Sequence, residues 1–280
     1  GLPPTAQLVV DVGNTETVVG LFGLARGVPP AGESPPFLGS WRYATVTPRT
    51  PDELLLLLRA FLAGEEPGGA PRVAQAVIGS VVPAQTDLLR KALPRLPGSP
   101  EVLQVDPTTP LPIRLQVDEP RTVGADRIVN TLAAAHLFRR DTIVVDLGTA
   151  TTYDCITGEG DFIGGVIAPG ILAGQEWLAG RTAKLPRVEF RPPERVIGRR
   201  TETCLHSGIF HSAVDAMDGI VRRIREEWGS PDILVVGTGG LAATLAPHSS
   251  TLARVEPHLT LVGLALAGAY MASDRGSGLQ

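Results

Sequence analysis

Lysine and cysteine are both scarce in this chain of 280 residues, and their scarcity excludes several kinds of site. Arginine supplies 23 of the 25 basic residues, and the only lysines are Lys91 and Lys184. Neither lysine follows a glycine in a G-x-x-x-x-G-K-[ST] run, so the sequence excludes a P-loop. The only cysteines, Cys155 and Cys204, are not in C-x-x-C spacing, which supports neither a disulfide framework nor a zinc site.

Long apolar runs and an excess of positive charge are also missing. The longest strongly apolar stretch, residues 259–272, is shorter than the roughly 20 residues that span a bilayer, so we expect a cytoplasmic protein that does not enter a membrane. A net charge of −4 gives no basis for binding nucleic acid. No H-E-x-x-H or G-x-S-x-G pattern is present, which excludes the corresponding metalloprotease and hydrolase sites.

A short acidic turn stands out among the features that are present. Residues 8–22 read LVVDVGNTETVVGLF: a β-branched run reaches Asp11, turns at Gly13 and Asn14 and resumes at Thr17. This pattern is typical of two strands joined by a tight turn. Its carboxylate, glycine, amide and hydroxyl suit a triphosphate with its Mg²⁺, although for one isolated copy ordinary turn chemistry is the favoured explanation.

A second copy of the turn favours the functional interpretation. Residues 142–153 read TIVVDLGTATTY. Two such turns about half a chain apart predict a duplicated domain, residues 1–140 and 141–280, with a nucleotide held between the copies. The correspondence pairs Asp146 with Asp11, Gly148 with Gly13, Thr149 with Asn14 and Thr152 with Thr17.

The expected elements repeat in the same order in both halves. Three strands, a helix, a strand, a helix and a strand are expected in the first half, followed by a helix that starts near residue 122. Thr50-Pro-Asp-Glu53 predicts a helix start with a capping box. A helix over about 202–228, ended by Gly229, has an apolar stripe that fits a core face and a dimer face equally. The stripe consists of Leu205, Ile209, Ala213, Met217, Ile220, Ile224 and Trp228.

Five motifs together identify a resemblance to a known family. They are Asp11-Val-Gly-Asn-Thr15, Gly124-Ala-Asp-Arg127, Asp146-Leu-Gly-Thr-Ala-Thr-Thr152, Gly164-Gly-Val-Ile-Ala-Pro-Gly170 and Gly198-Arg-Arg-Thr201. In this order they resemble the motifs of type III pantothenate kinases. The resemblance implies an α/β fold of duplicated ribonuclease H-like (actin-like ATPase) domains, each a mixed five-stranded sheet flanked by helices.

The resemblance also implies a reaction, transfer of the ATP γ-phosphate to the terminal hydroxyl of pantothenate, which yields 4'-phosphopantothenate for coenzyme A biosynthesis. Such a transfer needs a phosphate cradle, a divalent metal and a group that accepts the alcohol proton. Asp11 is expected to face Mg²⁺ through water, and Asp146 to mark a site for K⁺ or NH₄⁺. The residues expected to bind ATP are Asp11, Val12, Gly13, Asn14, Thr15, Glu16, Thr17, Val18 and Thr149.

The Gly124-Ala125-Asp126-Arg127 motif is expected to bind pantothenate. Asp126 is the implied general base, although the helix macrodipole alone would explain an acidic residue in a first turn. Arg127 would pair with the pantothenate carboxylate through its guanidinium fork. Thr201 is expected at a helix N-cap, and in the family the matching threonine contacts pantothenate from the neighbouring subunit of a homodimer.

Three features leave alternatives open. Val117 stands where the family usually has an aromatic residue against pantothenate, which keeps a kinase for another small alcohol possible; a regulator without catalysis is a second rival. The turn at 237–240 fits either a nearby adenosine or a plain tight turn. The arginine-rich loop from Arg187 to Arg200 fits either an anionic partner or a solvated surface.

Overall fold

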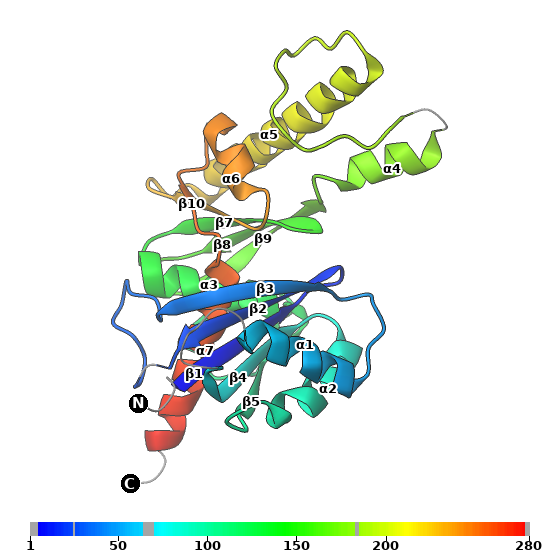
Figure 1. Cartoon of the computed structure of the whole chain (residues 1–280). Coiled ribbons are helices and arrows are strands. Elements are labelled where there is room, and N and C mark those ends of the chain that lie inside the picture. Colours follow the sequence, from blue (N-terminus) through cyan, green and yellow to red (C-terminus); the bar gives the residue numbers. More distant parts are fainter. Residues whose placement is uncertain (1–4, 25, 64–69, 183–184, 278–280) are drawn as a thin grey trace. The chain divides into compact units, whose positions relative to one another are not determined.

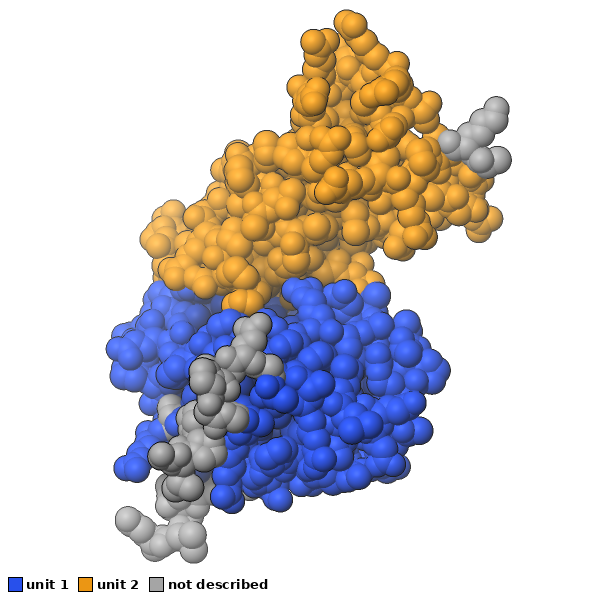
Figure 2. All heavy atoms as spheres, in the orientation of Figure 1, with its two compact units in different colours: residues 1–139, 159–162, 259–280 blue, residues 140–158, 163–258 orange. Residues whose placement is uncertain are grey.

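The computed structural model describes residues 5–24, 26–63, 70–182 and 185–277, so Lys184 lies outside the described residues. Contacts divide the chain into two compact units, which Figure 2 shows in different colours. Unit 1 contains residues 1–139, 159–162 and 259–280, and unit 2 contains residues 140–158 and 163–258. This division differs from the expected boundary at residue 140 because the last helix packs on unit 1.

The sheet of unit 1 has the strand order β3-β2-β1-β4-β5 (Figure 1). Strands β1 and β2 form the predicted hairpin, and β2 also pairs with β3 in the antiparallel direction. Strands β4 and β5 add on the other side of β1 in the parallel direction. The strands are β1 (Thr5–Val12), β2 (Glu16–Gly23), β3 (Phe37–Ala44), β4 (Arg72–Ser80) and β5 (Glu101–Val105).

The second sheet repeats this topology. Its order is β11-β10-β7-β8-β9-β6, in which β7 and β8 are antiparallel and β10 and β11 add in the parallel direction. The sixth strand, β6, was not expected, and it pairs with Asp161 and Phe162 at the start of β9. The strands are β6 (Arg114–Leu115), β7 (Thr142–Leu147), β8 (Ala150–Ile156), β9 (Asp161–Pro169), β10 (Leu234–Thr238) and β11 (Arg254–Val255).

Helices cover both faces of the first sheet because its central strands are apolar on both sides. Leu8 and Val10 of β1 pack in one buried cluster with α1 and α2, whereas Val9 packs in another with α3 and α7. The helices of unit 1 are α1 (Pro51–Ala63), α2 (Pro83–Ala92), α3 (Ala125–Phe138) and α7 (Leu259–Ser277), with short 3₁₀ helices η1 (Leu93–Arg95) and η2 (Pro120–Thr122).

The predicted capping box at the start of α1 is confirmed. The Thr50 N–H donates to Glu53 Oε2 at 2.7 Å, and the Glu53 N–H donates to Thr50 Oγ1 at 3.2 Å. Pro51 is the first residue of the helix, where its missing N–H is tolerated. This helix start is therefore determined by local chemistry.

Helix α7 belongs to unit 1 because Gly263 and Gly268 allow close packing there: a Cβ on Gly268 would collide with the side chains of Gln7 and Gln75. A Cβ on Gly263 would collide with the carbonyl of Val129 in α3, so the two helices approach closely. Further along, Gln7 Nε2 donates to Gln75 Oε1 at 2.6 Å and to the Ala265 carbonyl at 3.1 Å. These buried amide contacts attach the last helix to β1 and β4 of the first sheet.

In unit 2 the buried face of the long helix α5 is shifted from the predicted stripe and shares Met217 with it. Phe210, Val214, Met217 and Val221 are buried against β7, β8 and β10, whereas most of the stripe is only partly buried. Gly229 ends α5 with φ 69°, as predicted. The other helices are α4 (Ala173–Arg181), α6 (Ala242–Leu245) and the 3₁₀ helix η3 (Ala246–His248), and α5 spans Thr201–Trp228.

A buried carboxylate attaches α5 to the loop before β11. Asp218 accepts hydrogen bonds from the hydroxyls of Ser249, Ser250 and Thr251 at 2.6–2.9 Å and from the Ser250 N–H at 2.8 Å. Burial alone would raise the pKa of Asp218, but these hydrogen bonds outweigh it and lower the pKa below its ordinary value. Within the described ranges, no helix combines the length and the apolar character needed to span a membrane.

Candidate functional site

The first acidic hairpin lies at the carboxyl end of β1. Asp11 pairs with Val18 across the hairpin, and the Gly13 N–H donates to the Glu16 carbonyl at 3.0 Å to close the turn. A Cβ on Gly13 would lie only 2.9 Å from that carbonyl oxygen, which explains why glycine is needed there. The turn is therefore a fixed backbone feature.

Side chains of the expected ATP-binding residues differ in their access to solvent. Asn14, Thr15 and Glu16 at the tip are exposed, and Asp11 is half-buried. Thr17 is fully buried, and its hydroxyl lies 2.8 Å from Thr45 Oγ1, so this side chain joins the hairpin to the end of β3. Val12 is also buried, whereas Gly13 and Val18 are half-buried.

The second hairpin is one residue shorter than the first. Asp146 pairs with Thr152, and the Gly148 N–H donates to the Ala150 carbonyl at 3.1 Å. The strand register places Thr151 opposite Leu147, as Thr17 lies opposite Val12. The expected correspondence of Thr152 with Thr17 is therefore wrong by one residue, because the shortened turn shifts the second strand.

Two glycines allow other segments to pack closely against the backbone of the second hairpin. A Cβ on Gly170 would collide with the Thr149 carbonyl, and one on Gly239 would lie 2.7 Å from the Leu147 carbonyl oxygen. Gly239 also has a φ of +89°, a left-handed backbone that favours glycine. The turn at 237–240 therefore lies against the hairpin with Asp146, at the same end of the second sheet.

Asp126 lies in the first turn of α3, two residues after the helix N-cap Gly124. Its Oδ1 accepts the Arg127 N–H at 2.9 Å. A Cβ on Gly124 would lie 2.6 Å from that same oxygen, although the backbone there (φ −64°, ψ 149°) is open to any residue. The glycine of the motif therefore makes room for the Asp126 carboxylate.

The start of α3 and the first hairpin lie at the same edge of unit 1. Asp11 pairs with Gly79 of β4, and a Cβ on Gly79 would lie 3.7 Å from Ala125 Cβ. One step further along, the Val81 N–H donates to the Val12 carbonyl at 3.2 Å, and Val81 Cγ1 lies 3.7 Å from the Cβ position of Gly124. Residues widely separated in sequence thus meet at the carboxyl ends of two parallel strands, the usual location of ligand sites in such sheets.

An aromatic ring supports Arg127. The Arg127 guanidinium carbon lies 4.9 Å from the centre of the Phe162 ring, a cation–π distance, and Phe162 is only 2% exposed. The Gln116 N–H donates to the Phe162 carbonyl at 2.9 Å, so Val117, which is half-buried, follows directly on this pairing. Sequence reasoning did not identify Phe162 as a site residue. The feature that would have indicated it is the pairing of Phe162 with β6, and a strand of two residues is too short to recognise in sequence.

Thr201 is exposed and is the first residue of α5, so the expected N-cap role is wrong; the N-cap is Arg200. The hydroxyl of Thr203 accepts the N–H groups of Arg199 and Arg200 at 3.1 Å each and so satisfies the backbone before the helix. Helix start signals in sequence are uncertain by one or two residues when the cap is not Ser, Thr, Asn or Asp.

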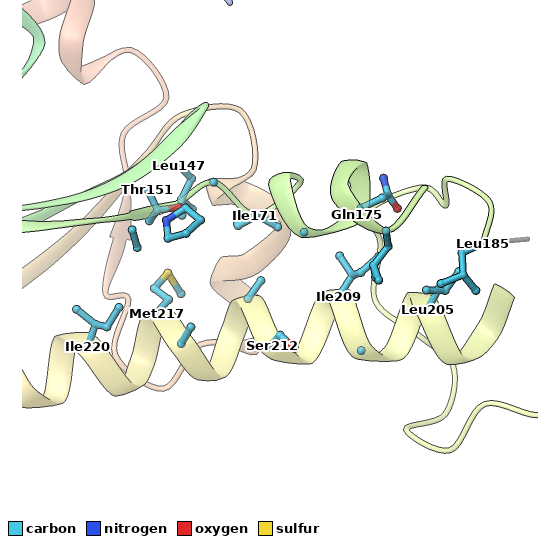
Figure 3. Close-up of a pocket in the computed structure, with 18 of the residues that line it drawn as sticks. Leu147, Thr151, Ile171, Gln175, Leu185, Leu205, Ile209, Ser212, Met217 and Ile220 are labelled. Atoms are coloured by element: carbon cyan, nitrogen blue, oxygen red, sulfur yellow. The ribbon is translucent and has the colours of Figure 1, made fainter. Parts of the chain in front are cut away.

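Beside Thr201 runs a groove of about 600 Å³ within unit 2, here called the α5 groove. Figure 3 shows Leu205, Ile209, Met217 and Ile220 on α5, with Leu147, Thr151 and Ile171 on the opposite side of the groove. The predicted stripe of α5 therefore faces a largely apolar groove along much of its length. Leu147, Thr151 and Tyr153 line its inner end, where burial raises the pKa of Tyr153 to about 12.

The oxygen donors at the two hairpins fit the hard cations expected there. Mg²⁺ is commonly held by one or two carboxylates together with water and substrate phosphates, which matches the single carboxylate of Asp11 beside exposed Thr15. Asp146, half-buried beside exposed Thr149, offers a carboxylate of the same kind. No cluster of three or more His, Cys, Asp or Glu side chains suited to a metal occurs among the residues with described placement.

Comparison with known proteins gives consistent matches over nearly the whole chain. The family model for type III pantothenate kinase matches residues 7–223. The type III pantothenate kinase of Frankia alni is 43% identical over 259 residues, covering 92% of this chain and 97% of the relative. That of Moorella thermoacetica is 41% identical over 258 residues, covering 92% and 96%.

Solved structures with little sequence similarity share the fold. The ethanolamine utilization protein EutJ of Carboxydothermus hydrogenoformans has a TM-score of 0.55 at 18% identity and covers 95% of this chain and 91% of its own. A Sinorhizobium meliloti protein described as a 2-dehydro-3-deoxygalactonokinase has a TM-score of 0.52 at 14% identity, covering 95% and 99%. The predicted actin-like ATPase architecture is confirmed by these likenesses and by the repeated strand order.

Proposed function

The chain belongs to the type III pantothenate kinases, and from that membership we propose how its own residues divide the work of phosphoryl transfer. It is a phosphotransferase with an alcohol group as acceptor: it phosphorylates pantothenate with ATP, in coenzyme A biosynthesis. The roles of single residues described below are our proposals.

One observation carries the proposal for unit 1. The hairpin that holds Asp11 and the helix start that holds Asp126 meet at one sheet edge, through the Val12–Val81 hydrogen bond and the contact of Gly124 with Val81. A phosphate cradle and a carboxylate base are the two parts that must lie near each other in a kinase site. This arrangement supports Asp126 as the general base.

In the proposed reaction the terminal hydroxyl oxygen of pantothenate attacks the γ-phosphorus of ATP. The new O–P bond forms as the bond from the γ-phosphorus to the bridging oxygen breaks, so ADP leaves. The hydroxyl proton moves to the Asp126 carboxylate, which the Arg127 N–H orients at Oδ1. Gly124 has no side chain that would displace the Asp126 carboxylate. The backbone of Gly124 and Ala125 is proposed to approach the substrate there.

Binding of the pantothenate carboxylate is assigned to Arg127. A guanidinium fork pairs with a carboxylate through two parallel hydrogen bonds. Phe162 lies under the guanidinium at 4.9 Å and limits its rotation. We propose that this buried ring, by packing on Arg127, replaces part of the support that the family's aromatic residue supplies, since residue 117 here is valine.

The exposed hairpin tip is proposed to bind the triphosphate of ATP. Asn14, Thr15 and Glu16 offer backbone N–H groups there, whereas Val12, Thr17 and Val18 contribute through the backbone that holds the turn. Asp11 would hold Mg²⁺ through water, and bound Mg²⁺ would neutralise the charge on the phosphates. In unit 2, Thr149 is proposed to bind phosphate and Asp146 to hold K⁺ or NH₄⁺.

We further propose a homodimer in which α5 contacts a second copy of the chain. Five of the seven stripe residues of α5 line the α5 groove, and an apolar groove of this size is usually covered or occupied. Thr201 lines the same groove, and the family resemblance implies that it contacts pantothenate bound to the neighbouring subunit. Sedimentation of an active monomer would contradict this arrangement.

Measurement of ADP release tests the assignment against its two rivals. With Mg²⁺ and K⁺ present, release should require pantothenate and should be absent with other hydroxy acids or without an acceptor. Release with another acceptor would indicate a kinase for a different small alcohol, the possibility that Val117 raises. Absence of release with every acceptor would indicate a regulator that keeps the fold without the reaction.

A further inference from the structure

A second polar site lies where the loop 191–200 folds over the start of α5, within unit 2. A hollow of about 250 Å³, here called the arginine hollow, opens there. Its charged or titratable lining consists of Arg191, Arg195, Arg199, Arg200, Glu194 and His206. None of these side chains has a role in the proposed phosphoryl transfer.

His206 is the buried polar group of this hollow. It lines the hollow from the second turn of α5 and is only 6% exposed. Its ring makes no hydrogen bond or ion pair with any residue that the structure describes. The ring nitrogens of His206 are not among the buried unpartnered polar atoms of the described residues, so they are accessible from the hollow, where an anion can accept a hydrogen bond from the ring.

The arginines of the hollow are mostly without acidic partners. Arg191 lies 3.8 Å from a carboxylate oxygen of Glu189. In the described part of the chain, Arg195, Arg199 and Arg200 have no ion pair. Like charges gathered around one hollow repel, and a multiply charged anion would convert that repulsion into attraction. Guanidinium forks match the oxygens of phosphate groups in geometry as well as in charge.

Close packing fixes the loop that carries these arginines. A Cβ on Gly198 would collide with the backbone N of Cys204, so the loop lies directly on the first turn of α5. Ser207 Oγ donates to the Val196 carbonyl at 2.5 Å, one turn further along. The hollow therefore has a fixed floor at the N-terminus of a 28-residue helix, an end that carries partial positive charge.

We propose that the arginine hollow binds a phosphate-type anion with two or more negative charges, with His206 and the unpaired arginines as its partners. The volume of 250 Å³ is below the roughly 300–1,000 Å³ of pockets for drug-sized ligands, so the bound group is small, of the size of phosphate or diphosphate. No residue of either acidic hairpin lines the hollow, and the proposal does not depend on the proposed catalytic roles.

Calorimetric titration of the full chain with diphosphate tests the proposal. A non-hydrolysable ATP analogue at saturation keeps the ATP site occupied, and binding of one diphosphate per chain is expected. Arg195→Gln combined with Arg199→Gln should weaken binding about hundredfold, since each charged contact contributes about tenfold. Arg187→Gln is the matched control, because this exposed arginine of the same loop does not line the hollow.

A second variant and a second set of ligands sharpen the result. His206→Phe keeps a ring but removes both nitrogens, and it should weaken diphosphate binding about tenfold. Inorganic phosphate and glycerol phosphate, titrated in parallel, distinguish a free ion from a phosphorylated metabolite as the ligand. Absence of binding to wild-type chain, equal affinity in the double arginine variant, or loss of binding when the analogue is present would each overturn the proposal.

Discussion

Gly124→Ala should reduce turnover without destabilising the protein. The new Cβ would lie 2.6 Å from Asp126 Oδ1, and ordinary van der Waals contact begins at 3.4 Å, so the carboxylate must withdraw by about 0.8 Å. That movement breaks or lengthens the 2.9 Å hydrogen bond from the Arg127 N–H. Since a misplacement of about 1 Å can cost about 10²-fold in rate, we expect kcat to fall roughly 10–100-fold.

The backbone at Gly124 makes this substitution a clean test. Its φ of −64° and ψ of 149° suit alanine, so unfolding stability should stay equal or rise by about 0.4–1 kcal/mol. Steady-state ADP release and thermal unfolding, measured together, separate the two effects. Gly180→Ala is the control, because a Cβ there meets nothing within 4 Å. A Gly124→Ala enzyme with kcat within twofold of wild type would refute the proposed role of the Asp126 carboxylate.

Three further substitutions test other parts of the structure. Asp126→Asn should lower kcat about 10²–10⁴-fold in the ADP assay while calorimetry shows ATP binding unchanged; near wild-type turnover would contradict the general base. Phe162→Leu removes the ring under Arg127, so KM for pantothenate should rise about tenfold with a smaller change in kcat, and an unchanged KM would exclude a positioning role. Asp218→Asn tests how the free energy of unfolding depends on pH. The pKa of Asp218 is lower in the folded protein than in the unfolded chain, where it is about 3.9. The ionised carboxylate therefore stabilises the fold above about pH 3.9, and this stabilisation is lost as the pH falls through the folded pKa. Denaturant unfolding of wild type should therefore weaken more than that of Asp218→Asn between about pH 5 and pH 2, and parallel profiles would contradict this.

Local chemistry made some elements readable in the sequence. Thr50 and Glu53 form the predicted capping box because both partners lie within one turn of helix. The hairpin at Asp11 was predicted from a β-branched run interrupted by a turn glycine, which is also a short-range signal. Strand β5 (Glu101–Val105) is the last strand expected in the first half.

Other features depend on strand register and on contacts between residues far apart in the sequence, which local patterns do not reveal. The register of β7 and β8 makes Thr151, not Thr152, the equivalent of Thr17, since a turn shortened by one residue moves every later side chain. Helix α7 lies in the second half of the sequence but packs against α3, at Gly263, in unit 1. Phe162 contacts Arg127 only because a two-residue strand pairs with the start of β9.

By itself the sequence determined the duplicated order of strands and the two acidic turns, because short-range periodicity and turn chemistry encode them, whereas the role expected of the motif around Asp126 came from the family resemblance. Only the tertiary structure decided that Gly124 makes room for the Asp126 carboxylate and that the stripe of α5 lines a groove. The physical reason is that an amphipathic pattern specifies which residues avoid water but not which surface covers them. Close approach at a glycine likewise depends on the backbone that faces it, which folding alone brings there.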